Sequence, residues 1–294
     1  MPPSTVTAPD QYAAPDTTAM GYAWRWLTAL AIWGTIFINY YANTHPFNGQ
    51  TMGQVSATYP TLLTPAGYAF SIWGLIFLGL LVYSVWQLLP AQQKLSLPDA
   101  VAKPLTLACL CTSAWVVLFA YELILPSVGV MLLILMSLAV TYGRVRRRIF
   151  AEAAPAWVGV PFSLFLGWIS VASVINLTIG IRHLGWQTAE GISVVLTLGL
   201  LFIVVVLALI MSRVFRDLVF PLVVAWALAW LWVARLHEVP ELGWAALAGA
   251  VVCIVLGFTL SRVGGRKTPW QLRDEAAKAI EAEIAARNAA RQNH

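Results

Sequence analysis

Side chains that could bind a metal or a haem iron are few, and they lie beside long apolar segments. His45, His183 and His237 each adjoin such a segment, and Glu122 and further glutamates lie in similar positions. Imidazole and carboxylate groups can ligate a transition metal or a haem iron. Because the connections between the apolar segments are short, polar residues gather there even without a ligand. We expect solvated loop side chains at these positions, and a metal or haem site is the alternative.

The sequence offers no convincing catalytic arrangement. It contains no recognisable Ser–His–Asp or Cys–His set, so an enzymatic function is not indicated. No Asp, Glu, Lys or Arg lies near the middle of an apolar segment. Proton pumps, ion-coupled transporters and voltage sensors usually carry such a charge. The sequence therefore favours ligand binding, a structural role or the movement of an uncharged solute.

Tryptophan is the most unusual residue type, with 14 in 294 residues. Many lie near segment ends, where an aromatic belt at the membrane surface is expected. Because an indole N–H in hydrocarbon needs a hydrogen-bond partner, deeper tryptophans should face the interior of a helix bundle. A cavity lined in this way suits a large, flat, apolar ligand, and simple packing by bulky rings is the alternative. The deep tryptophans are Trp33, Trp73, Trp115, Trp168, Trp226 and Trp230.

Two amides, Asn39 and Asn176, lie in apolar segments toward the side that we expect to be outside. Their ordinary role would be a hydrogen bond between helices, worth roughly 1 kcal/mol. Gripping the polar edge of a ligand is the alternative.

The composition indicates a membrane protein. Hydrophobic residues make up 60% of the chain and charged residues only 11%, whereas soluble domains carry roughly 25% charged residues. The net charge of +5 would otherwise suggest nucleic acid as a partner, but the basic residues lie at the ends of apolar segments. We therefore expect the lipid bilayer as a partner and no nucleic acid.

The predicted fold is an all-α, polytopic membrane helix bundle. A helix of about 20 apolar residues crosses the hydrocarbon core of a bilayer. Its backbone N–H and C=O groups must form hydrogen bonds within the helix itself. About eight transmembrane helices are predicted, at residues 24–43, 66–88, 104–122, 125–143, 158–180, 190–212, 218–236 and 243–263.

The basic residues predict the orientation. With the N-terminus inside, all 18 Lys and Arg residues except Arg182 and Arg235 fall on the inner side. The loop of residues 144–148 is the strongest inner anchor, and the outer loop of residues 44–65 has no charged residue. We expect both termini to be cytoplasmic, in the inner membrane of a bacterium.

The two ends of the chain differ from the apolar part. Residues 1–21 are polar and rich in Pro, Ala and Thr, which predicts a disordered cytoplasmic tail. Residues 264–294 predict a cytoplasmic amphipathic helix, because Thr268 and Gln271 can form a capping box before apolar residues that recur every fourth position.

Three motifs, in chain order, resemble those of the TspO/MBR family, also called translocator or tryptophan-rich sensory proteins. Residues 64–77, TPAGYAFSIWGLIF, are similar to the family pattern P-P-x-W-V-F-x-P-V-W-T-x-L-Y. Trp115 and Phe119 resemble the N-x-x-W-x-x-x-F motif of the next helix, with threonine in place of the asparagine. Trp168 and Asn176 keep the spacing of the W…A-x-x-x-N stretch in the fifth helix.

The resemblance covers residues 22–182 and implies a five-helix bundle with a pocket near the loop between the first two helices. Residues 183–263 would add three transmembrane helices. Family members bind porphyrins and other flat apolar ligands, and are implicated in tetrapyrrole sensing, transport or breakdown. The resemblance thus implies porphyrin or haem as a ligand, with the loop of residues 44–65 as a lid. The implied pocket residues are Tyr68, Trp73, Phe77, Trp115, Phe119, Trp168 and Asn176.

Three functions remain open from the sequence. The first is a TspO-like protein that binds a tetrapyrrole-like ligand for sensing or transport. The second is a structural or accessory subunit of a larger membrane complex, which the three additional helices and the amphipathic tail suggest; a homodimer is a further form of assembly. The third is a permease for a lipophilic solute, which an aromatic cavity would also suit.

The predicted orientation determines which cysteines a membrane-impermeant maleimide can reach in intact cells. In a chain whose native cysteines are replaced by alanine, Asn48→Cys should be labelled from outside. Gln93→Cys should be labelled only after the membrane is opened. The reverse pattern would invert the topology, and labelling of both from outside would show that the number of spans between them is wrong.

Overall fold

A computed structural model describes residues 19–263 except 60, 153 and 187–189, together with residues 275, 278, 279, 281, 282 and 284. Residues 1–18 of the predicted tail therefore lie outside the described residues, and so does most of the predicted amphipathic helix. The first helix begins at Ala19, within the last residues assigned to the tail.

The described part of the chain is helical and has no strand. Its long helices are α1 (Ala19–Thr44), α3 (Ile72–Trp86), α4 (Leu97–Ala120), α5 (Ile124–Glu152), α6 (Val160–His183), α7 (Glu190–Phe215), α8 (Val219–Arg235) and α9 (Pro240–Arg262). A short helix, α2 (Met52–Thr58), lies in the outer loop. Three single turns of 3₁₀ helix are η1 (Gly67–Ser71), η2 (Pro90–Gln92) and η3 (Ala156–Gly159).

The polytopic helical bundle predicted from the sequence is confirmed. Within the described residues, six helices are long and apolar enough to cross a membrane: α3 with the preceding η1, α4, α5, α6, α7 and α9. The other two long helices fall short of that standard for different reasons. Helix α8 is apolar but has 17 residues. Helix α1 has 26 residues, but tryptophan, tyrosine, threonine and asparagine lower its hydropathy. Eight membrane crossings therefore remain a prediction.

Two boundaries differ clearly from the sequence prediction. Helix α4 begins at Leu97 rather than at residue 104, so Pro104 lies inside the helix. Residues 144–148, predicted as an inner loop, are helical, because α5 continues to Glu152. Arginine is a good helix former, so a run of arginines does not end a helix.

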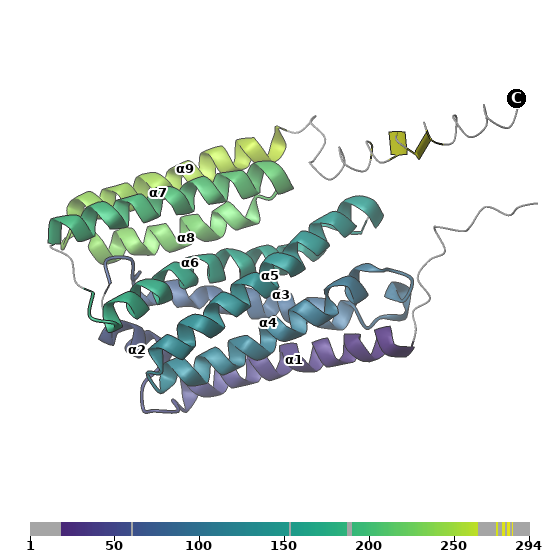
Figure 1. Cartoon of the computed structure of the whole chain (residues 1–294), viewed down its shortest axis with the longest axis horizontal. Coiled ribbons are helices and arrows are strands. Elements are labelled where there is room, and N and C mark those ends of the chain that lie inside the picture. Colours follow the sequence, from purple (N-terminus) through teal and green to yellow (C-terminus); the bar gives the residue numbers. More distant parts are fainter. Residues whose placement is uncertain are drawn as a thin grey trace, which may run out of the picture.

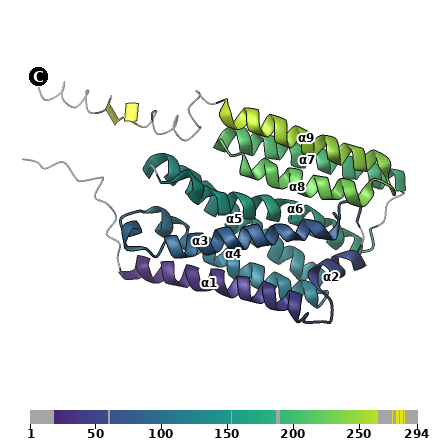
Figure 2. The same ribbon diagram turned by 180° about the vertical axis from the view of Figure 1, so that it is seen from behind.

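The helices form two groups, visible in both ribbon views (Figures 1 and 2). Helices α1, α3, α4, α5 and α6 form the first group, and α7, α8 and α9 lie on α6 as the second. Helix α8 makes the main contact with α6. Gly167 of α6 allows this approach, because a Cβ there would lie 3.0 Å from Cβ of Val223 in α8.

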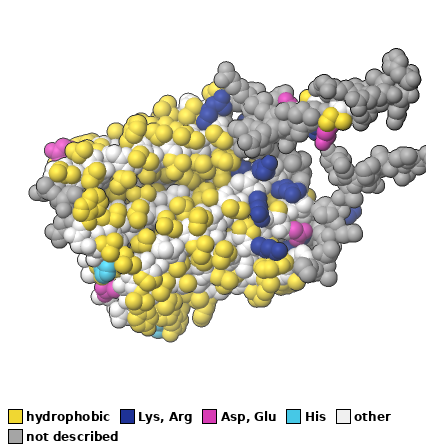
Figure 3. All heavy atoms as spheres, in the orientation of Figure 1, with side chains coloured by type: hydrophobic (Ala, Val, Ile, Leu, Met, Phe, Trp, Pro, Cys, Tyr) yellow, Lys and Arg dark blue, Asp and Glu magenta, His cyan; other side chains and the backbone are white. Residues whose placement is uncertain are grey.

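The surface matches the membrane orientation that the sequence predicts. Hydrophobic side chains cover the flank of the molecule, and Lys and Arg gather at one end (Figure 3). Helix α1 begins and α9 ends at this same end (Figure 1). We call it the inner end, because the positive-inside rule predicts that it faces the cytoplasm.

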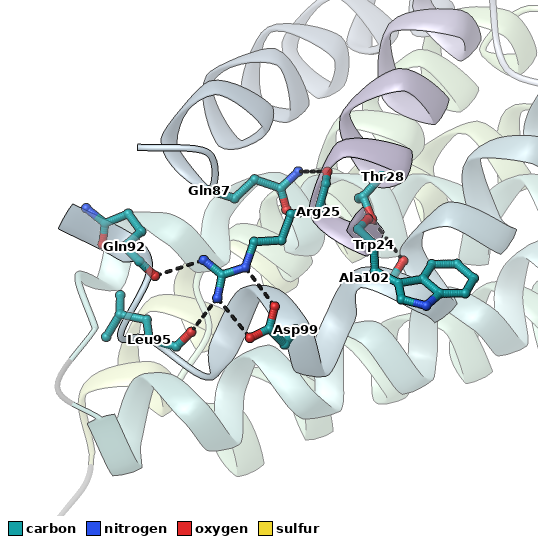
Figure 4. A network of polar contacts seen from close by, with 8 residues as sticks. All are labelled: Trp24, Arg25, Thr28, Gln87, Gln92, Leu95, Asp99 and Ala102. Carbon is teal, nitrogen blue, oxygen red and sulfur yellow. Dashed lines mark hydrogen bonds and ion pairs between the residues drawn. The ribbon is translucent and has the colours of Figure 1, made fainter. Parts of the chain in front are cut away.

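Arg25 fixes the start of α1 at the inner end (Figure 4). The residue is 1% exposed, and its Nε and Nη2 donate to the two carboxylate oxygens of Asp99 at 2.7 and 2.8 Å. The same guanidinium donates to the backbone carbonyls of Gln92 at 2.9 Å and Leu95 at 3.0 Å. A bidentate pair with further hydrogen bonds is the geometry that offsets the cost of burying a charge.

A second buried ion pair joins the two helix groups. Asp217, in the connection between α7 and α8, is 2% exposed. Its carboxylate lies 3.2 Å from Nη2 of Arg146 and accepts hydrogen bonds from Tyr142 of α5 at 2.8 Å. Ser163 of α6 donates to the same carboxylate at 2.6 Å. The second group is therefore tied to α5 and α6 by hydrogen bonds as well as by packing.

Replacing Asp99 should destabilise the fold, because Arg25 would stay buried without its counter-charge. We expect Asp99→Asn to lower the free energy of unfolding by about 2–3 kcal/mol. Unfolding by sodium dodecyl sulfate in mixed micelles measures this. Lys94→Gln, a change of an exposed charge in the same connection, is the control and should stay within about 0.5 kcal/mol. An equally small effect of Asp99→Asn would contradict the proposed role of the pair.

Candidate functional site

An aromatic cavity lies between α4, α6 and η1, near the outer end of the first helix group. Its volume is about 30 Å³. Four rings line it, and Asn176 is the amide among its lining residues. The rings belong to Phe70, Trp115, Phe119 and Trp168.

The rings are arranged as two pairs, one on α4 and one between η1 and α6. Trp115 and Phe119 lie one helical turn apart on α4, and their rings stack with centroids 4.9 Å apart and an angle of 14°. Phe70 of η1 meets Trp168 of α6 edge to face, with centroids 5.7 Å apart. Both geometries are favourable for aromatic pairs.

Asn176 connects three helices beside these rings. It is 3% exposed, and its Oδ1 accepts a long hydrogen bond from Nε1 of Trp115 at 3.4 Å. Its Nδ2 donates to Oγ of Ser127 in α5 at 3.3 Å. The expectation of an interhelical hydrogen bond thus holds for Asn176. It does not hold for Asn39, whose side chain donates to the carbonyl of Thr35 in its own helix at 2.9 Å.

The structure brings together only part of the predicted pocket. Trp115, Phe119, Trp168 and Asn176 line the cavity, whereas three predicted residues do not. Tyr68 is 74% exposed and packs against the ring of Trp230, 5.4 Å away.

Trp73 and Phe77 form a neighbouring cluster instead. Their rings stack with centroids 5.1 Å apart, and Trp73 meets Phe165 edge to face at 5.8 Å. This cluster is packing within the helix group.

The six deep tryptophans divide in a similar way. Trp115 and Trp168 are buried, as expected, but Trp33 and Trp226 are about two-fifths exposed, at 38% and 37%. Their indole N–H groups still have protein partners: Trp33 donates to Ser84 at 2.8 Å and Trp226 to the carbonyl of Ala69 at 3.0 Å. The expected partner is missing for Trp230, whose buried Nε1 has no hydrogen-bond partner among the described residues.

The outer loop forms the end wall of the cavity. Ser56 of α2 and Pro65 line it. Beyond α2, the hydroxyl of Tyr59 donates to Glu122 at 2.7 Å. This hydrogen bond, with smaller contributions from burial and the carboxylate charge, raises the pKa of Tyr59 above its ordinary value.

Helix α8 holds the other end of this loop. Nη2 of Arg235 donates to the carbonyls of Thr61 at 2.9 Å and Thr64 at 3.3 Å. The backbone N–H of Ala66 donates to the carbonyl of Trp230 at 3.1 Å. We did not predict these contacts from the sequence. The available signal was that Arg235 is one of only two basic residues that fall on the outer side in the predicted orientation.

The histidines do not form a metal site in the part of the chain that the structure describes, where no group of three or more His, Cys, Asp and Glu side chains could hold an ion. His45 stacks on Tyr41, with ring centroids 5.0 Å apart, and His183 lies edge to face with Tyr59 at 6.5 Å.

Removing the Tyr59 hydroxyl should loosen α2. We expect Tyr59→Phe to increase hydrogen exchange across residues 52–59 about fivefold, which corresponds to about 1 kcal/mol. Because the pKa of Tyr59 is raised, its contribution is fully present below the ordinary tyrosine pKa of about 10 and is lost as the pH rises through the raised value.

The exposed Tyr40→Phe on α1 is the matched control and should leave this exchange unchanged. Unchanged exchange in Tyr59→Phe would show that the hydroxyl does not hold the loop.

Comparison with known proteins gives one match. A family model described as TSPO-like protein matches residues 25–259. The match includes α7, α8 and most of α9, so it extends beyond residues 22–182, on which the three motifs lie. No curated protein and no solved structure matches the chain. The chain belongs to the TSPO-like protein family.

Proposed function

We propose that this membrane protein binds a flat, apolar, tetrapyrrole-like ligand in the aromatic cavity, for sensing or transport. The observation that carries this proposal is the combination of two aromatic pairs with one buried amide in a single cavity. Stacked rings offer flat apolar faces, and the amide offers both a donor and an acceptor for a polar edge. Membership of the family supports the same ligand class.

The cavity is too small for such a ligand in this conformation. A volume of about 30 Å³ holds roughly one water molecule, whereas ligand sites usually measure roughly 300–1,000 Å³. Binding therefore requires a wall to move. The outer loop is the suitable wall, because it contributes Ser56 and Pro65 and is a connection between long helices. Its buried apolar side chains, Met52, Val55 and Leu63, would have to shift with it.

Sensing and transport place different demands on the same cavity. None of the described helices carries a charged side chain near its middle. Transport, if that is the use, would not be coupled to protons through such a group. Sensing requires only that the outer loop adopt different conformations in the ligand-free and the ligand-bound protein.

Titration of the purified protein with protoporphyrin IX tests the proposal. Tryptophan fluorescence should be quenched saturably, and Trp115→Leu should weaken binding about tenfold, equivalent to about 1.4 kcal/mol. Asn176→Leu should weaken it as well, because a polar edge of the ligand would lose its partner.

Trp244→Leu is the matched control, since this tryptophan lies on α9 and is 57% exposed. Its removal should leave the affinity unchanged. Quenching that does not saturate, or equal losses in Trp244→Leu and Trp115→Leu, would contradict the proposal.

A further inference from the structure

A second cavity lies between α6, α7 and α8, where the two helix groups meet. Its volume is also about 30 Å³. Only aliphatic side chains line it, with neither a ring nor a polar group among them. They include Val174 of α6, Leu201 of α7 and Leu228 of α8, and Leu63 of the outer loop.

The two cavities share a wall. Pro65 of the outer loop and Ile175 of α6 line both of them. Ile175 directly precedes Asn176, so one turn of α6 presents an amide to the aromatic cavity and an aliphatic group to both. Pro65 belongs to the loop whose movement the proposed function requires. Displacement of that loop would therefore remove Pro65 from the shared wall and leave Ile175 between the two cavities.

The two compartments suit different parts of a molecule. Paired rings match a rigid flat ring system, whereas a slot of Leu, Val and Ile side chains matches a flexible or branched hydrocarbon chain. Rigid macrocycles alone would leave the aliphatic slot empty. Because lipid and detergent tails are as apolar as these side chains, an unbranched or prenyl-type chain would be favoured in the slot by close van der Waals contact.

We propose that the natural ligand is a tetrapyrrole-like ring that carries a long aliphatic substituent, with the ring in the aromatic cavity and the chain in the aliphatic one. This inference rests on the proposed function, because it extends the same site. It also assigns a role to the second helix group: α7 and α8 build the compartment for the chain, and α8 holds the shared loop through Arg235.

Two probes with the same ring test the inference: methyl pheophorbide a, which carries a methyl ester, and pheophytin a, which carries a phytyl ester. Both are titrated by tryptophan quenching in the same micelles at equal ligand-to-detergent ratios. Leu228→Phe fills the aliphatic cavity without adding a tryptophan. The exposed Leu222→Phe on the same helix is the matched control.

Wild-type protein should bind the phytyl ester about tenfold more tightly than the methyl ester, because the chain gains packing contacts in the slot. Leu228→Phe should remove most of this difference and leave the methyl ester within about twofold of wild type, while Leu222→Phe should change neither. Leu201→Phe on α7 is a second way to fill the cavity if Leu228→Phe fails to fold. The ratio of the affinities of wild-type protein for the two esters can be measured without any variant.

The outcomes separate the two proposals. Equal affinity for both esters, or a difference that survives in the filled cavity, would overturn the chain compartment while ring binding still supported the aromatic site. Failure of both esters to bind would overturn both proposals.

Discussion

Polar groups inside a bilayer need partners within the protein, and this constraint organises the centre of the molecule. The clearest case is Asn176, whose amide joins α4 through Trp115 and α5 through Ser127. One side chain thereby fixes three helices relative to one another. The fixed arrangement leaves the ring pairs of α4 and α6 facing a common cavity, so the interaction that satisfies the amide also forms the candidate site.

The same constraint makes the two ends of the molecule different. At the inner end, two buried ion pairs hold the helices: Arg25 with Asp99, and Arg146 with Asp217. At the outer end, the loop is held by the hydroxyl of Tyr59 and by the guanidinium of Arg235. Local opening costs least where few buried contacts are lost. The outer loop also buries side chains, among them Met52, Val55 and Leu63. Because it is a connection between long helices, we infer that it is the part of the cavity wall that moves while the inner end stays fixed.

The sequence could predict the elements better than the contacts between them. Hydropathy located the eight long helices, and the charge count placed the basic residues at one end, because both follow from the bilayer alone. Motif spacing could not show which face of a helix points inward. Two residues predicted to line the pocket show this: Tyr68 lies on the surface, and Trp73 packs against Phe165 outside the cavity. The pairing of Asn176 with Ser127 depends on the register of α5 and α6, which no local pattern encodes.

Helices α7, α8 and α9 look like an addition when only motifs are compared, but the family match runs to residue 259 and α8 contacts the loop that closes the cavity. The central claim is that this aromatic site holds a flat apolar molecule. Purifying the protein from its native membrane and analysing a solvent extract by absorbance and mass spectrometry tests the claim most directly. We predict a coloured, tetrapyrrole-like compound in near-stoichiometric amount, lost in Trp115→Leu and retained in Trp244→Leu. An extract without such a molecule, or one retained equally by both variants, would contradict the account.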